Sequence, residues 1–116
     1  MNDIIKIDGK EFPFNFGLNA TREFVKETGI KTLNLQLQII SQLDYTFLAI
    51  YLGIKDGFRK QGKQLVLKIE DLVDLFENDP NSIADAIKVM AEQMKIIESK
   101  FSINKESKNV KSPKKN

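Results

Sequence analysis

The segment from Phe47 to Ile54 (FLAIYLGI) constrains the fold most, because nearly all of its residues are apolar. In a helix such a run places apolar side chains on every side, and a helix of this kind usually lies at the centre of its domain. We predict this helix over about 42–60, started by Ser41 and Asp44 in the spacing of a capping box. The run is far too short to span a bilayer. Other elements must therefore pack around it.

The N-terminal segment has the pattern of a β-hairpin. Apolar and polar residues alternate over 3–7 and again over 11–16, and Asp8 and Gly9 form a favoured tight-turn pair between them. Because Pro13 cannot donate a backbone hydrogen bond, its strand must expose that edge or bulge there. A two-stranded hairpin is marginally stable alone. We therefore expect its phenylalanines to pack on helices.

Three further amphipathic segments predict helices over about 20–28, 69–78 and 81–101. Asn19 is the expected N-cap of the first, and Gly29 its expected end. Asp79 is expected to cap the last helix, with Pro80 in its first position. The predicted fold class is mainly α (α+β), an N-terminal β-hairpin packed on a bundle of about four helices.

Two stretches carry other signals. Residues 31–40 alternate apolar and polar, which favours a strand, with a loop containing a helical turn as the alternative. Residues 104–116 hold five lysines and one acid, a net charge of +4, whereas the other residues sum to −2. Because this tail is almost without apolar residues, we predict that it is disordered. The chain therefore divides into a single domain over 1–103 and a lysine-rich tail over 104–116.

The composition excludes several kinds of chemistry. Among the 116 residues there is no cysteine, so disulfides and thiolate metal sites are impossible. There is also no histidine, which removes the commonest general base and the commonest transition-metal ligand. The acids between Glu70 and Asp85 lack the glycine and alternate spacing of a calcium loop. We expect no catalytic residue, no cofactor and no metal site, and hence no enzyme.

One stretch imitates a phosphate-binding loop. In GFRKQGK (57–63), Gly57 is followed after four residues by Gly62 and Lys63. A P-loop requires a preceding strand, a following helix, and Ser or Thr after the lysine. Here a predicted helix precedes, an extended segment follows over 64–68, and Gln64 follows the lysine. We interpret the stretch as the polar end of the central helix, stopped by Gly62.

Two surfaces could bind partners. The last predicted helix carries a heptad stripe that serves either as core or as a partner-facing seam: Ile83, Ile87, Met90, Met94, Ile97 and Phe101. The lysine tail could contact nucleic acid, but it has no aromatic residue to stack on bases and no arginine for base edges. A solvated tail is the favoured interpretation. The N-terminus lacks the pattern of a signal peptide, which favours a cytoplasmic protein.

The run IDGKEFPFNFGLNATREFVKETG (7–29) resembles the opening of the small tail assembly chaperones of long-tailed bacteriophages and prophages. In that family a Gly-Lys turn, an aromatic-bearing strand, and Gly-x-x-Ala-x-Arg leading into a helix recur together. The matching positions are Gly9, Lys10, Phe12, Phe16, Gly17, Ala20, Arg22, Phe24 and Gly29. The stretches FLAIYLGIKDGFRKQGK and KIEDLVDLFENDPNSIADAIKVM resemble the family's later helices. Lys68 departs from the pattern, where Thr or Ser would be expected.

This resemblance implies a non-enzymatic protein that binds the tape measure protein, keeps it soluble and recruits tail tube subunits. It also implies self-association, a cytoplasmic location in the infected bacterial host, absence from the mature virion, and in many members a longer frameshifted form. The residues expected at partner contacts are Phe12, Phe14, Arg59, Met90, Met94 and Phe101. The alternative is a small nucleic-acid-associated regulatory protein that uses the basic C-terminal tail. No membrane partner is expected.

Overall fold

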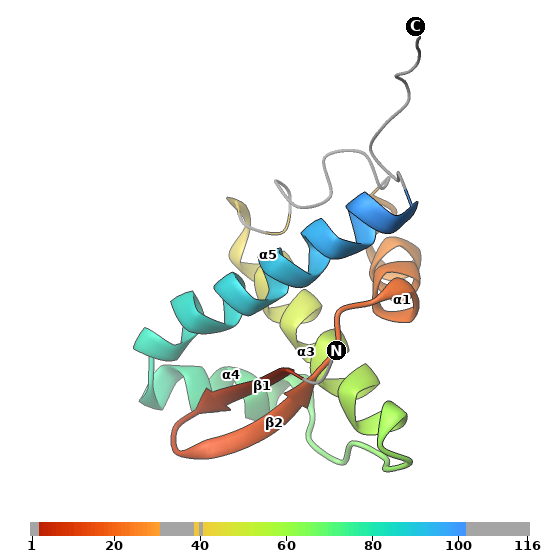
Figure 1. Cartoon of the computed structure of the whole chain (residues 1–116). Helices are drawn as coiled ribbons and strands as arrows, with labels where there is room; N and C mark the ends of the chain where they lie inside the picture. Colours follow the sequence, from red (N-terminus) through yellow and green to blue (C-terminus); the bar gives the residue numbers. More distant parts are fainter. Residues whose placement is uncertain (1–2, 31–38, 40, 102–116) are drawn as a thin grey trace, which may run out of the picture.

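Two strands and four helices make up the part of the chain that the computed structural model describes, residues 3–30, 39 and 41–101. In chain order they are β1 (Asp3–Ile7), β2 (Lys10–Phe14), α1 (Leu18–Thr28), α3 (Leu43–Lys60), α4 (Ile69–Asn78) and α5 (Asn81–Phe101) (Figure 1). The predicted class, a hairpin followed by helices in an α+β fold, is confirmed. Apart from Ile39, the alternating segment 31–40 and the tail 104–116 lie outside the described residues.

The hairpin has the predicted tight turn. β1 and β2 pair antiparallel with Ile7 opposite Lys10, and the two residues between them, Asp8 and Gly9, have positive φ angles of 52° and 78°. Positive φ at both positions is what a two-residue type I′ turn requires. Hydrogen-bonded and non-hydrogen-bonded pairs alternate from this turn, so Pro13 falls at a non-hydrogen-bonded position. Its missing N–H is therefore not needed, and no bulge is required.

β2 ends at Phe14, two residues before the predicted end at Phe16. The next backbone N–H groups leave the sheet. Asn15 donates to the carbonyl of Gly53 on α3 at 2.9 Å, and Phe16 donates to Oε1 of Gln93 on α5 at 2.6 Å. These two bonds turn the chain away from β1 and tie the hairpin to both long helices.

The hairpin packs closely on α3 over a glycine notch formed by Gly53 and Gly57. The residues of its inner face are all buried: Ile5, Ile7, Phe12 and Phe14. A Cβ atom on Gly53 would lie 2.3 Å from the ring of Phe14, and one on Gly57 would lie 2.4 Å from the carbonyl oxygen of Pro13. Any side chain at either position would overlap the hairpin. The notch is therefore what allows β2 to reach the helix.

The predicted central helix is α3, which contacts β2, α1, α4 and α5 (Figure 1). Its apolar run is buried through Ala49, Ile50, Leu52 and Ile54, which confirms its place at the centre of the fold. The helix begins at Leu43, and its N-cap residue is Gln42. The predicted start at the capping box of Ser41 is therefore wrong by about one residue. Tertiary burial, rather than the cap, determines where this helix lies.

The C-terminal end of α3 is a Schellman motif. Gly62 has a φ of 74°, its N–H donates to the carbonyl of Arg59, and the N–H of Lys63 donates to that of Phe58, each at 2.9 Å. Glycine is favoured here because a side chain in the left-handed region is strained. The predicted stop at Gly62 is confirmed.

Helix α1 begins earlier than predicted. Its N-cap residue is Gly17, and Asn19 lies within the first turn, where its Oδ1 accepts a hydrogen bond from Arg22 at 3.3 Å. The predicted cap at Asn19 is therefore wrong. Gly29 ends the helix as predicted, with a φ of 75° and an N–H that donates to the carbonyl of Val25 at 2.7 Å.

α4 covers the predicted 69–78 and packs against α3 through Phe76, whose ring stacks on Phe47 with centroids 5.6 Å apart. The Asp71 carboxylate accepts a hydrogen bond from the N–H of Lys68 at 3.1 Å, which supplies one half of a capping box. The Asp71 carboxylate thus partly replaces the cap that Thr or Ser at position 68 would provide.

The turn between α4 and α5 binds the hairpin. α5 begins at Asn81, as predicted, but the Asp79 carboxylate does not serve that helix. It accepts a hydrogen bond from the N–H of Asp8 in the β-turn at 2.8 Å, while the Asp79 backbone carbonyl accepts from Ser82. The expectation that Asp79 caps α5, with Pro80 in its first position, is therefore wrong, because the Asp79 carboxylate binds the β-turn and Pro80 precedes the helix.

Candidate functional site

A hollow of about 320 Å³ lies where the end of β2, the start of α1, the end of α3 and the last turns of α5 meet. We call it the α1–α5 hollow. It is lined by Asn15, Phe16, Gly17, Leu18, Asn19, Asp56, Arg59, Lys60, Gln93, Ile96, Ile97 and Lys100. Its lining combines apolar side chains with three cations and one carboxylate. This mixture suits a partner that presents both apolar and acidic groups.

The carboxylate of Asp56 fixes one wall of the hollow. Asp56 is only 6% exposed, and its two oxygens accept hydrogen bonds from Asn15 Nδ2 at 2.7 Å and from Arg59 Nε at 2.6 Å. The hydrogen bond and then the charge of Asp56 raise the pKa of Arg59 above its ordinary value. More than half of the Arg59 side chain remains exposed. Asp56 therefore orients a cation that still faces solvent.

Gln93 forms the back of the hollow and joins three elements. It is 5% exposed; its Oε1 accepts from the N–H of Phe16 at 2.6 Å, and its Nε2 donates to Asp3 Oδ2 at 2.7 Å and to the Phe14 carbonyl at 3.1 Å. A buried amide with all of these bonds made is rigid, and removing it would leave buried backbone groups without a partner. The hollow is thus a pre-formed feature.

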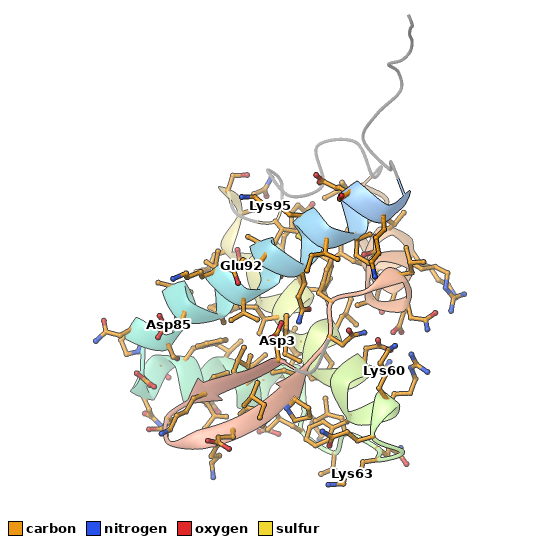
Figure 2. All side chains as sticks on the ribbon, in the orientation of Figure 1. Asp3, Lys60, Lys63, Asp85, Glu92 and Lys95 are labelled. Carbon is orange, nitrogen blue, oxygen red and sulfur yellow. The ribbon has the colours of Figure 1, made fainter. Side chains whose placement is uncertain are left out.

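A second hollow of about 380 Å³ shares Asn19, Asp56 and Arg59 with the first. It adds the cations Arg22, Lys55 and Lys63, of which Lys55 pairs with Glu23 at 3.1 Å. Figure 2 shows Lys60 and Lys63 near the end of α3, with Asp85 on the opposite side of the view. The cations thus gather around Arg59.

Four of the predicted partner-binding residues lie inside the fold. Phe12, Phe14, Met90 and Met94 are between 1% and 8% exposed. Their side chains form the core beneath the hairpin and α5, so none of these four expected contact residues is exposed. Met90 and Met94 of the heptad stripe are therefore core residues, whereas Ile97 of the same stripe lines the hollow.

The other two predicted residues lie at the C-terminal ends of helices. Arg59 is exposed at the end of α3 and lines both hollows. Phe101 ends α5, but its side chain lies outside the described part of the structure. Of the predicted set, Arg59 is the residue that the structure places in the candidate site.

Two residues that organise the hollow carry only weak sequence signals. Gln93 lies on the buried face of α5 together with Ala86 and Met90. In the sequence it is marked only as a polar residue at helical spacing among apolar ones. Asp56 precedes Arg59 by three residues on α3, which is the spacing of a side-chain pair. Neither pattern alone indicates that the groups are buried.

The glycines of GFRKQGK have separate structural reasons. Gly57 belongs to the glycine notch beneath Pro13, and Gly62 ends α3 in the left-handed region. Residues 57–60 of the stretch belong to α3, and residues 63–68 after the turn have no regular structure. The stretch therefore lacks the strand-loop-helix arrangement that cradles phosphates.

Within the described residues, no group of three or more Asp or Glu side chains is placed to hold a metal ion. No helix over the same ranges combines the length and apolar character needed to cross a membrane.

Comparisons with protein-family models, with curated proteins and with solved structures found no match to this chain.

Proposed function

We propose that this protein is a non-enzymatic tail assembly chaperone of a long-tailed phage or prophage. It binds the tape measure protein, keeps it soluble and recruits tail tube subunits. The observation that carries the proposal is the order of parts that resembles this family. A Gly-Lys turn, an aromatic strand and Gly-x-x-Ala-x-Arg open the chain, followed by the central helix, the acidic helix and the long last helix.

The fold is compatible with this proposal, because the segments that carry the resemblance pack on one another. The aromatic strand lies on the glycine notch of α3, and the carboxylate of Asp79 between α4 and α5 binds the turn at Asp8. Chaperoning requires reversible contacts with a protein chain rather than bond-making chemistry. A pre-formed hollow with apolar and charged walls supports such contacts.

The proposal includes where and when the protein acts. It works in the cytoplasm of the infected bacterial host, associates with copies of itself, and leaves before the virion is complete. Light scattering at two protein concentrations tests self-association: the apparent mass should rise with concentration. A monomer mass at both concentrations would contradict that part of the proposal.

One observation favours a second candidate function, a nucleic-acid-associated regulator. The cations around Arg59, Lys60 and Lys63 could neutralise phosphates, together with the lysines of 104–116. However, the large hydrophobic side chains that are exposed in the described part are aliphatic, namely Ile4, Leu18, Leu43 and Val66. In the described part the aromatic side chains are buried or only partly exposed, which makes them poorer stacking platforms than those of single-strand binders. We therefore place this candidate second.

Affinity purification after co-expression separates the two candidates. A tagged copy of the chain is produced with the tape measure and tail tube proteins encoded beside it, and the captured material is analysed for protein and nucleic acid. We expect capture of the tape measure protein, followed by the tube protein. Capture of nucleic acid in a manner that weakens steeply with salt, with neither protein present, would instead support the regulator.

A further inference from the structure

We propose that the α1–α5 hollow is a docking site for an acidic amphipathic segment of a partner protein. An apolar side chain of the segment enters the hollow, and flanking carboxylates pair with Arg59, Lys60 and Lys100. This inference rests on the proposed function only for the identity of the partner. The chemistry of the site does not depend on it.

The apolar half of the site comes from α1 and α5. Leu18 is 48% exposed, and Ile96 and Ile97 are partly buried beside it. Burying aliphatic surface of this kind stabilises a complex by roughly 25 cal/mol per Å² of area removed from water. A cavity of about 320 Å³ accommodates one or two side chains rather than a whole helix. The site therefore suits an anchor residue on a partner's surface.

The charged half of the site determines which segment fits. Arg59, Lys60 and Lys100 are exposed and line the hollow, whereas its one carboxylate, Asp56, is buried and already bonded to Asn15 and Arg59. The hollow also lies at the N-terminal end of α1, which adds a partial positive charge. The rim therefore has an excess of positive charge that complements acidic side chains and repels basic ones.

Other occupants fit less well. The chain's own tail over 104–116 carries a net charge of +4 and would be repelled by the rim. The acidic face of α4 in a second copy offers Glu70, Asp74 and Glu77, but α4 has no large apolar side chain among the exposed ones in the described part. Nucleic acid would satisfy the cations but not the apolar wall. An acidic amphipathic segment satisfies both.

Fluorescence anisotropy with a designed peptide tests the chemistry directly. The probe is a fluorescein-labelled amphipathic helix of about 18 residues with a leucine stripe flanked by glutamates. We expect saturable binding to the full chain. The affinity should fall as the salt concentration rises, because salt screens the attraction between exposed charges. A matched peptide with glutamine in place of each glutamate, and a labelled thymidine oligonucleotide, should bind at least about tenfold more weakly.

Charge reversal locates the binding. The double variant Lys60→Glu/Lys100→Glu should weaken binding of the acidic peptide by about tenfold or more. The matched control is Lys88→Glu/Lys95→Glu, which changes the net charge equally at exposed α5 positions outside the hollow. Figure 2 shows Lys95 and Lys60 well apart, Lys95 on the upper side of α5 and Lys60 below it, near the end of α3. The control should bind like the parent chain, and both variants should keep its circular dichroism and melting temperature.

Several outcomes would overturn the inference: equal binding of the glutamate and glutamine peptides, tighter binding of the oligonucleotide, or equal loss in both double variants. Conversion of an oligomer to a monomer by Lys60→Glu/Lys100→Glu would also overturn it, since a second copy would then be the occupant.

Capture of the tape measure protein is measured separately with the same variants. If the parent chain captures none, the proposed function fails while the peptide result stands. If both double variants capture it equally well, the docking site fails while the proposed function stands.

Discussion

Replacing Gly57 by alanine tests the packing of the hairpin on α3, because local and tertiary effects have opposite signs. Alanine is favoured over glycine inside a helix by about 1 kcal/mol, so helix propensity alone predicts a more stable protein. The structure predicts the reverse. The new Cβ would lie 2.4 Å from the Pro13 carbonyl oxygen and 2.8 Å from the backbone nitrogen of Phe14. Because ordinary contacts are about 3.5 Å, β2 would have to move by roughly 1 Å.

The magnitude follows from what that movement disturbs. Overpacking of a core typically costs about 1–3 kcal/mol. The movement also weakens two hydrogen bonds of Asn15, to the Gly53 carbonyl and to Asp56, each worth about 1 kcal/mol. After subtraction of the gain in propensity, we expect Gly57→Ala to lower the free energy of unfolding by about 2 kcal/mol. In urea this corresponds to a fall of the midpoint by about 1 M.

A double-mutant cycle distinguishes this contact from a general effect. At Gly53 the overlap is with the ring of Phe14, so Phe14→Leu should offset part of the cost of Gly53→Ala, by about 1 kcal/mol. At Gly57 the overlap is with backbone atoms. The loss of stability caused by Phe14→Leu should therefore add fully to the loss caused by Gly57→Ala. Urea unfolding followed by circular dichroism measures all five variants. A Gly57→Ala variant more stable than the parent chain would refute the packing described here.

Four further experiments test separate parts of the molecule. Gln93→Leu should destabilise the protein by about 2 kcal/mol or more in the same urea assay, because it leaves the buried N–H of Phe16 without its acceptor; an unchanged midpoint would contradict that role. Asp79→Ala should cost only about 0.5–1 kcal/mol, since its bond to the Asp8 N–H is exposed, and a loss as large as that of Gln93→Leu would contradict this ranking. Removal of 104–116 should leave the urea midpoint unchanged if the tail is separate from the domain, whereas a lower midpoint would show that it packs on the body. Thermal melting with magnesium ATP should show no shift, and a shift abolished by Lys63→Ala would restore the phosphate-loop interpretation.

The sequence predicts most elements of this fold because their signals are local. The Asp8-Gly9 turn requires positive φ, Gly62 ends a helix, and the apolar run of α3 indicates burial, so each could be recognised from neighbouring residues. The caps predicted at Ser41 and Asn19 were wrong. Tertiary contacts shift the start of a helix by one or two residues from the position that the local capping signal indicates.

The candidate site could be predicted only in part. Arg59 is recognisable as a base at a polar helix end, but its position over two hollows depends on Asp56, Asn15 and α5, which are distant in sequence. The phenylalanines and methionines expected at partner contacts are buried instead, because an apolar stripe looks the same whether it faces the core or a partner. The role of Gly57 could not be predicted for a similar reason. A glycine near a helix end more readily indicates the end of that helix than a close contact with another element.

The soluble fraction of the tape measure protein, measured with and without this chain, tests the proposed function most directly. The two proteins are co-expressed, and the tape measure protein is quantified in the supernatant and in the pellet after lysis. We predict that the chain raises the soluble fraction severalfold, and that Lys60→Glu/Lys100→Glu raises it less than Lys88→Glu/Lys95→Glu does. A tape measure protein that remains in the pellet beside an abundant, soluble and folded chain would contradict the proposal.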